Sequence, residues 1–361
     1  MTDTRGVATT ELEVMVRLDE RPGNPAITPE GRMILSLHPF PHGEASPYRV
    51  VEVLHDGSTV PFPNEEWSTA PDSEGVGLSA VIGVQSDSKG VVWILDIGGG
   101  ENPSPKLVAW DTRKDELHRV IHVPPDATRY NSFQQDLAID EAHDAIFIAD
   151  VCHGDLFGTS DPAIVAVDLE TGSVRRALQD HPSLQPEEDV SLVIGGHPLL
   201  TLNPQGELEE SKIGLDPIVI DHQNEWVYYG ALHGKSIFRV RAADLLDESL
   251  SEEELGSRVQ RHGDKPISDG ISIDTAGNVY VTDLASNAIG ITAPDGSYHI
   301  LTRDDEHCIW PDGMSHGPDG YLYVTASQLH RSAPLNAGEE VSEPPFEVLR
   351  FRPLAPGAVG R

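Results

Sequence analysis

Three aspartates recur at the same place in a repeated pattern, and their spacing could bring carboxylates together. Asp269 and Asp312 each stand in an Asp-Gly pair that starts a short apolar run, and Asp216 starts a similar run. Carboxylates that converge raise one another's pKa unless a cation or a proton lies between them. We therefore predict Asp216, Asp269 and Asp312 as ligands of a divalent cation such as calcium or magnesium, and Asp269 and Asp312 as catalytic residues.

Two other interpretations of these aspartates stay open. The first is a metal-free site in which the carboxylates act as a general acid and a general base. The second is purely structural, because an Asp before Gly often bonds backbone amides of its own loop.

The elements that would position these aspartates form an internal repeat. Residues 268–283 are echoed by residues 311–326, and each copy is a short apolar strand, a tight turn at Gly277 or Gly320, and a second alternating strand. That order is typical of a β-hairpin. Weaker copies, which bring the total to six, fit residues 23–37, 82–96, 135–150 and 216–231.

Most of these hairpins are followed by a further pair of strands, as at residues 106–111 and 163–168. Units of four strands at about 50 residues each account for most of the chain. Closing six such units into a ring leaves only short, protected edges. The sequence therefore predicts an all-β fold, a six-bladed β-propeller with four-stranded blades around a central channel.

The domain organisation follows from this fold. Residues 12–353 are expected to form a single propeller, between a flexible tail at 1–11 and a flexible tail at 354–361. An alternating strand at residues 12–19 is expected to complete the last blade beside residues 347–351. Short helical segments near residues 242–246 and 251–254, and a long connection at 179–214 with its own hairpin, lie between the blades.

The ends of the second strands supply further candidates, because the innermost strand of a propeller blade starts at the mouth where the second strand ends. His153 and His233 occupy equivalent loops, and a histidine with a pKa near 6.5 suits general acid/base catalysis. A nucleophilic Cys152 is less favoured, because adjacent residues at a strand end point apart. The polar residues expected to bind ligand at these ends are Asp96, Asp150, Asp283 and Asn287.

Aromatic residues indicate what the mouth would bind. Phe133 and Trp310 immediately precede inner strands, and Gln135 starts one of them. The two rings could stack on a planar ligand, or they could simply cap the core between blades. An acidic mouth with aromatic walls favours a neutral or cationic ring compound.

The charge balance excludes several classes of partner. The chain carries 59 acidic and 25 basic residues, a net charge of −34, which repels nucleic acid and anionic membranes. Gly98 to Gly100 precede no predicted helix, so we expect no nucleotide or flavin cofactor. The partner we predict is a small-molecule ligand.

Location and assembly are predicted from what the sequence lacks. No apolar run approaches the roughly 20 residues of a membrane helix, and the first ten residues contain no apolar core of a secretion signal. Two cysteines fit a reduced cytoplasmic setting. A closed ring without long free edges predicts a monomer.

Several segments occur in an order and spacing that are together specific. They are residues 92–98 with 105–111, 136–140 with 146–150, 214–220 with 227–229 and 236–240, and then 286–290 and 319–324. In this order they resemble the yellow and major royal jelly protein family, in its bacterial branch. The resemblance implies a six-bladed propeller with a ligand pocket at one mouth, and activities that include dopachrome conversion and the binding of small aromatic amines.

The Asp-Gly hairpins at 268–270 and 311–313 are also similar to those of gluconolactonase-type propellers. That likeness implies carboxylates and an Asn that hold a divalent cation for lactone hydrolysis. Together these features predict a small-molecule enzyme acting on a cyclic or aromatic metabolite, by lactone-type hydrolysis or quinonoid tautomerisation. The alternatives are a binding protein for small aromatic amines without turnover and, third, a protein-interaction scaffold.

Overall fold

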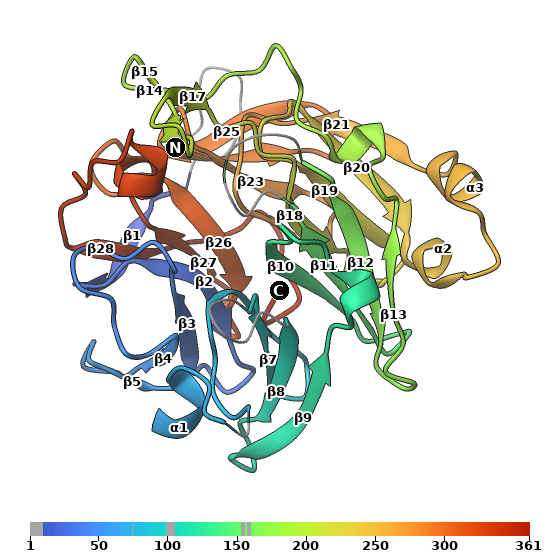
Figure 1. Cartoon of the computed structure of the whole chain (residues 1–361). Coiled ribbons are helices and arrows are strands. Elements are labelled where there is room, and N and C mark those ends of the chain that lie inside the picture. The colour runs from blue at the N-terminus through green and yellow to red at the C-terminus, as the bar shows by residue number, and fades with distance from the viewer. Residues whose placement is uncertain (1–9, 74, 99–104, 153–155, 157–159) are drawn as a thin grey trace.

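Six four-stranded antiparallel sheets surround a central axis in the computed structural model, which describes residues 10–73, 75–98, 105–152, 156 and 160–361 (Figure 1). In each sheet the strands follow one another outward from the axis. This arrangement confirms the six-bladed β-propeller predicted from the repeat.

The first three blades follow the order of the chain, with the innermost strand first. Blade 1 contains β2 (Pro22–Ile27), β3 (Met33–Leu37), β4 (Val50–Val53) and β5 (Thr59–Pro61). Blade 2 contains β6 (Val81–Ser86), β7 (Val91–Asp96), β8 (Lys106–Asp111) and β9 (Glu116–His122). Blade 3 contains β10 (Gln134–Asp140), β11 (Ala145–Asp150), β12 (Ala163–Asp168) and β13 (Val174–Ala177).

The last three blades include the one that closes the ring. Blade 4 contains β18 (Leu215–Ile220), β19 (Trp226–Ala231), β20 (Ser236–Arg241) and β21 (Gln260–Asp264). Blade 5 contains β22 (Ile271–Ile273), β23 (Val279–Asp283), β24 (Ala288–Thr292) and β25 (Tyr298–Arg303). Blade 6 contains β26 (Pro311–His316), β27 (Leu322–Ala326), β28 (Phe346–Phe351) and β1 (Glu13–Leu18).

The ring is latched by strands from both ends of the described chain, as the sequence predicted. β1 pairs antiparallel with β28, with Leu18 opposite Phe346. Glu13 and Arg350 form an ion pair at 2.9 Å across this pairing. Opening the ring would therefore break a strand pairing as well as the packing between blades.

The apolar core lies between neighbouring blades. Successive side chains of a strand point to opposite faces of its sheet, and each face packs against a neighbouring blade. Each of the six interfaces between blades holds a cluster of buried aliphatic and aromatic side chains. Phe147 in blade 3 and Tyr229 in blade 4, for example, belong to one such cluster. A further cluster, described below, lies over one end of the channel.

Elements outside the blades are short. α1 (Glu65–Ser68) follows blade 1, and η1 (Pro125–Ala127) and η2 (Pro182–Leu184) lie near blade 3. α2 (Ala242–Leu246) and α3 (Glu252–Gly256) lie outside blade 4 where helical segments were predicted, and Ser251 and Glu254 form the expected capping box. Among the described helices, none has the length and apolar character needed to cross a membrane.

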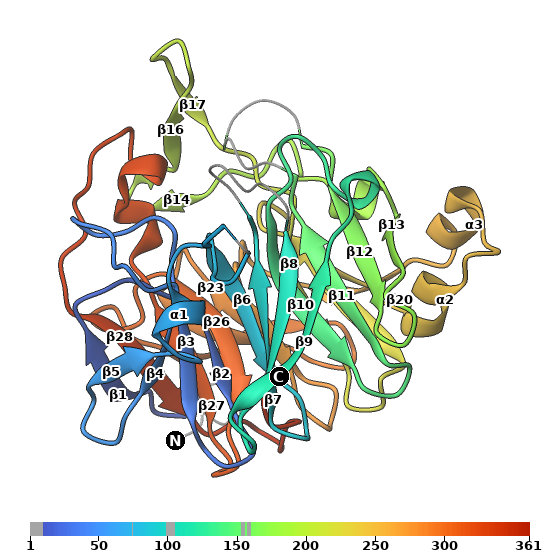
Figure 2. The same ribbon diagram turned by 60° about the horizontal axis from the view of Figure 1, so that its bottom comes forward.

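Two insertions stand over one end of the ring (Figure 2). The first, between blades 3 and 4, carries the hairpins β14 (Val193–Ile194) with β15 (His197–Pro198) and β16 (Leu200–Leu202) with β17 (Leu208–Glu210), which confirms a hairpin in this connection. The second carries η3 (Leu329–Arg331) and η4 (Ala333–Leu335). The two meet where the amide of Ala337 donates to the carbonyl of Leu200 at 2.9 Å. We call the pair of insertions, residues 186–214 and 328–343, the lid.

The opposite end of the channel is filled by residues 354–361, for which the sequence predicts a flexible tail. In the structure these residues lie at the centre of the ring (Figure 1). The amide of Gly360 donates to the carbonyl of His316, and Arg361 is 6% exposed and bonds both Glu141 and the carbonyl of Asp221. The segment is therefore bound to several blades, since its backbone also accepts from the amides of Ser86 in blade 2 and Thr275 in blade 5.

Candidate functional site

The predicted aspartates are positioned by the starts of the inner strands. We call this end of the channel the mouth. Asp216 lies in β18, Asp312 in β26, and Asp269 just before β22. The register of the inner strand shifts at its start in blades 1, 2, 3, 4 and 6. A β-bulge of this kind redirects side chains, and here it accompanies side chains that face the channel.

Glycine after the aspartate lets neighbouring inner strands approach each other. A Cβ atom on Gly270 would lie 2.2 Å from the carbonyl oxygen of Asp312, so a larger residue cannot fit there. A Cβ on Gly313 would lie 2.4 Å from the side chain of Asn24. The Asp-Gly pairs therefore serve convergence, since close backbone approach brings the carboxylates of blades 5 and 6 to one place.

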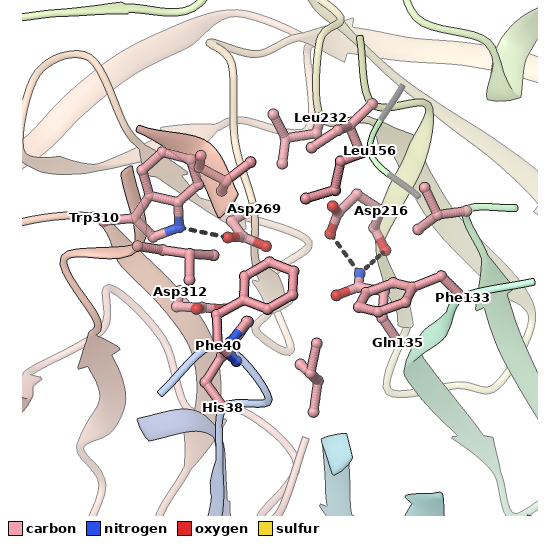
Figure 3. Close-up of a pocket in the computed structure, with 15 residues that line it drawn as sticks. His38, Phe40, Phe133, Gln135, Leu156, Asp216, Leu232, Asp269, Trp310 and Asp312 are labelled. Atoms are coloured by element: carbon pink, nitrogen blue, oxygen red, sulfur yellow. Dashed lines mark hydrogen bonds between the residues drawn. The ribbon is translucent and has the colours of Figure 1, made fainter. Parts of the chain in front are cut away.

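A cavity of about 40 Å³ at the mouth contains all three carboxylates (Figure 3). Its polar lining consists of His38, Gln135, Asp216, Asp269 and Asp312. Its apolar lining includes Phe40, Phe133, Leu232, Trp310, Leu329 and Leu335. The predicted ligand-binding residues Gln135, Phe133 and Trp310 thus meet the predicted catalytic aspartates at one site.

Hydrogen bonds fix two of the carboxylates. The indole Nε1 of Trp310 donates to Oδ2 of Asp269 at 2.6 Å, and the side-chain amide of Gln135 donates to both the carbonyl and the carboxylate of Asp216 (Figure 3). Among the described residues, no backbone amide donates to the carboxylate of Asp216 or Asp269. The interpretation as simple loop anchors therefore does not account for these two.

Burial raises the pKa of every carboxyl in this cavity, because a charged carboxylate is costly away from water. The pKa of Asp269 rises to about 6, and the hydrogen bond from Trp310 limits the rise. The pKa of Asp216 and that of Asp312 are raised well above the usual range, by burial and by the negative charge of Asp269. The cavity therefore favours the protonated form of each of these carboxyl groups.

A fourth carboxylate, Asp136, was not predicted as a site residue. Asn24 of blade 1 donates its side-chain amide to Asp136 at 3.1 Å across the channel. Burial raises the pKa of Asp136 to about 7, and the nearby Asp269 adds to the rise. Its position next to Gln135 in the bulged start of β10 is a signal that could have found it.

The predicted metal site is not preformed. No group of three or more His, Cys, Asp or Glu in the described part of the chain is arranged to hold a metal ion. The carboxylates that could bind a metal accept hydrogen bonds instead: Asp216 accepts from Gln135, and Asp269 accepts from Trp310. Each of these bonds engages one oxygen of its carboxylate, so a cation would have the other oxygen of each as a ligand.

The aspartates at the ends of the second strands lie outside the cavity lining, contrary to their prediction as ligand-binding residues. Asp96 accepts the backbone amides of Ser79, Ala80 and Gly98 at 3.0 to 3.1 Å. Asp150 accepts from the amides of Phe133 and Cys152, and Asp283 from the amide of Ser286 and the hydroxyl of Tyr298. All three turn back to anchor loops, since buried amides at strand ends need acceptors.

His233, Asn287 and Cys152 do not line the cavity either. His233 is fully buried, and its Nδ1 accepts from the amide of Ile213 at 3.0 Å. Asn287 lies in a turn at φ 48° with its amide directed to Asp305. His153 lies outside the described residues. Burial raises the pKa of the Cys152 thiol to about 11, which disfavours a nucleophilic thiolate.

The lid covers the mouth with an apolar cluster. Leu192 and Leu199 of the first insertion pack in one cluster with Leu329 and Leu335 of the second and with Trp310 of blade 6. Because a water molecule needs about 10–15 Å³, a 40 Å³ cavity holds only a few waters. A ring compound would require the lid to move.

Comparison of the sequence with known protein families identifies the family. The profile of the major royal jelly proteins matches residues 79–340. The chain belongs to the major royal jelly protein family. A search of curated proteins finds no sequence match.

Solved structures with the same fold are distant in sequence. A luciferin-regenerating enzyme aligns with a TM-score of 0.60 at 12% identity, covering 97% of this chain and 98% of that one. A gluconolactonase from Xanthomonas campestris has a TM-score of 0.58 at 11% identity, covering 97% and 93%. A calcium-binding regucalcin from Agrobacterium tumefaciens has a TM-score of 0.56 at 14% identity, covering 96% and 98%. These similarities establish the fold, and include the gluconolactonase-type propellers that the sequence resembled.

Proposed function

We propose that this member of the major royal jelly protein family is an enzyme that moves a proton on a small cyclic or aromatic substrate, bound at the propeller mouth. The observation that carries the proposal is the convergence of three buried carboxylates on one apolar cavity. The reaction is lactone-type hydrolysis or quinonoid tautomerisation. Perturbed carboxyl groups in a cavity are typical of acid/base sites.

The electrostatics divide the carboxyl groups into roles. Asp269, with its pKa near 6, is largely ionised at neutral pH and acts as the base. We assign Asp216 and Asp312 as the acids, because burial and the nearby carboxylates raise their pKa values well above the usual range. Groups whose environments separate their pKa values are how one site supplies both an acid and a base.

The same division serves both reactions. In tautomerisation the base removes a proton from one ring atom and an acid returns one to another. In lactone hydrolysis the base takes a proton from the attacking water, and an acid protonates the ring oxygen as it leaves. The apolar lid excludes bulk water, which strengthens each of these electrostatic interactions.

A divalent cation remains the other candidate for this site, and the similarity to a calcium-binding propeller is a likeness of fold. The proposed acid/base roles belong to the carboxyl groups themselves, and no step of the proposed reaction uses a cation. We expect activity to survive dialysis against EDTA. Loss of activity on chelation and recovery with Ca²⁺ or Mg²⁺ would show that the cation is required instead.

The test is a screen of lactones and of dopachrome, followed by Asp269→Asn and Asp312→Asn. Asn keeps the shape of Asp and one acceptor but can neither take up nor release a proton, so each variant should lower kcat by about 100-fold or more. Asp274→Asn is the matched control, because Asp274 is equally buried in blade 5 but lies at the opposite end of the channel. Full activity in both mouth variants would refute the proposal.

A binding protein for small aromatic amines is the second candidate. The cavity places the aromatic rings of Phe133 and Trp310 beside acidic groups, a combination that suits a cationic ring compound. Calorimetric titration with tryptamine or dopamine separates the two: a binder retains the amine unchanged, whereas the enzyme converts its substrate.

We further infer a cytoplasmic monomer with reduced thiols. Cys152 and Cys308 are both free and buried, and β1 covers the edge of β28. Gel filtration together with thiol titration under denaturing conditions tests this inference. A dimer in solution, or the absence of free thiols, would contradict it.

A further inference from the structure

His38 lines the carboxylate cavity but takes no part in the roles assigned above. It follows β3 of blade 1 and lies beside Phe40 and Asp312 (Figure 3). It also lines a second cavity of about 240 Å³, together with Tyr48 and Arg49. His38 as a whole is only 7% exposed, yet it borders two spaces that a ligand could occupy.

The protein fixes which nitrogen of this imidazole carries the proton. The backbone amide of Phe40 donates to Nδ1 at 3.0 Å, and an acceptor nitrogen must have a free lone pair. The proton of the neutral ring therefore resides on Nε2. Among the described residues, the bond at Nδ1 is the only hydrogen bond of the imidazole, so the Nε2–H group is available to a ligand.

Burial and a neighbouring arginine keep the ring neutral. Arg21 is anchored by the carbonyls of Phe40 and Ser327 and by the hydroxyl of Ser342, and its side chain is 0% exposed. Burial and the positive charge of Arg21 lower the pKa of His38 to about 3. His38 thus stays uncharged in a cavity rich in carboxyl groups, where a histidine would otherwise take up a proton.

We propose that the Nε2–H of His38 donates a hydrogen bond to a carbonyl oxygen of the substrate, and that the substrate is consequently a ring compound bearing a carbonyl, such as a lactone or a quinone. This inference rests on the proposed function. As Asp269 removes a proton from water or from the ring, negative charge develops on the carbonyl oxygen. His38 stabilises that charge without giving up its proton, and a protonated Asp216 or Asp312 completes the transfer. A neutral imidazole is a suitable electrophile for this purpose.

The first experiment needs no substrate. Two-bond ¹H–¹⁵N correlation spectra of the protein at pH 7, with His38→Gln to assign the signal, report the tautomer of His38. We expect Nε2 protonated and Nδ1 unprotonated, unchanged down to pH 5. A proton on Nδ1, or a ring that gains charge between pH 5 and 7, overturns the inference whether or not an activity is found.

The second experiment uses the substrate identified in the lactone and dopachrome screen. His38→Leu removes the donor and should lower kcat by roughly 100- to 1,000-fold, with KM changed by no more than about 3-fold. His38→Gln places an amide donor near the position of Nε2, and we expect it to retain kcat within about 10-fold of the wild type. His42→Gln, a partly exposed histidine of the same loop, should have full activity.

These variants separate the two proposals. If Asp269→Asn loses activity while His38→Leu keeps it, only the role of His38 fails. If Asp269→Asn and Asp312→Asn keep activity, the proposed function fails. Circular dichroism would show a failure of His38→Leu to fold. In that case a loss of kcat of about 100-fold or more in a folded His38→Gln variant overturns the donor role.

Discussion

The two ends of the propeller channel contain the same residue type in opposite settings. At the end where the inner hairpins turn, Asp274 accepts the amides of Ala276 and Asn278 at 2.9 and 3.0 Å, and Asp87 accepts that of Val91 at 2.8 Å. At the mouth, the carboxylates of Asp216 and Asp269 accept from the side chains of Gln135 and Trp310, and from no backbone amide of the described residues. A carboxylate held by amides fixes a turn, whereas one without them is free to exchange a proton.

The two ends also differ in what fills them. Residues 354–361 occupy the turn end and leave it packed, while the mouth keeps a cavity under the lid. The mouth is therefore the end of the channel at which we place the ligand. This difference supports a division in which one end of the inner strands stabilises the fold and the other carries the proposed chemistry. Variants at each end test that division.

The largest effect on stability is expected at the filled end. Gly360 has φ +91°, and a Cβ there would lie 2.2 Å from the carbonyl oxygen of Ser86. Gly360→Ala should therefore lower the free energy of unfolding by about 3 kcal/mol, from backbone strain plus displacement of the segment. Gly57→Ala is the matched control, because Gly57 has φ +83° with nothing within 4 Å. Equal urea midpoints for the two variants would show that residues 354–361 contribute little.

The amide-bound aspartates give the next effect. Asp274→Ala leaves two amides of its turn without their acceptor, and should cost about 2 kcal/mol in urea unfolding. Turnover per folded molecule should stay unchanged, because the cavity lies at the other end of the channel. The mouth variant Asp312→Asn should show the reverse, with activity lost and stability kept. A variant that loses both activity and stability, or neither of them, would contradict the distinction between the two ends.

How far the sequence predicts this molecule depends on the kind of interaction. The repeat of Ser268-Asp-Gly270 at Pro311-Asp-Gly313 is local, so it predicts the blades and the convergence of Asp269 with Asp312. The roles of Asp96 and Asp150 depend on whether nearby amides reach the carboxylate, and strand periodicity carries no information about that. Residues 354–361 contain Pro and Gly that are typical of a loose tail, and only tertiary contacts reveal their place.

The lid, Asp136 and the donor role of His38 escaped prediction for a related reason. Leu199 and Leu335 meet only because two insertions far apart in the chain pack together. His38 is recognisable as a donor only once the amide of Phe40 is seen to fix its tautomer, and burial and Arg21 to lower its pKa. Such features arise from contacts between loops, and loops have no periodicity to read.

The pH dependence of stability sharpens the comparison further. The pKa of Asp269 is near 3.8 when unperturbed and about 6 in the folded protein, so between these values the folded state binds more protons than the unfolded state. Stability should therefore fall as the pH rises from about 4 to 6, by of the order of 2 kcal/mol for this group. Asp269→Asn should remove that part of the decline in urea unfolding measured at each pH. An identical pH profile in the variant would mean that Asp269 is ionised normally.

The smallest effect is expected at Cys152, which lies near the mouth but outside the cavity lining. Its thiol is 0% exposed and donates to Oδ1 of Asn131 at 3.1 Å, and burial raises its pKa to about 11. A thiol in this state is protonated at neutral pH and cannot act as a nucleophile. Cys152→Ser keeps a donor of similar size, so kcat should change less than about 2-fold and the free energy of unfolding by less than about 1 kcal/mol. Cys152→Ser leaves the shape of the site unchanged. A loss of activity comparable to that of Asp269→Asn would therefore show that the reaction depends on this thiol and not on the carboxylates alone.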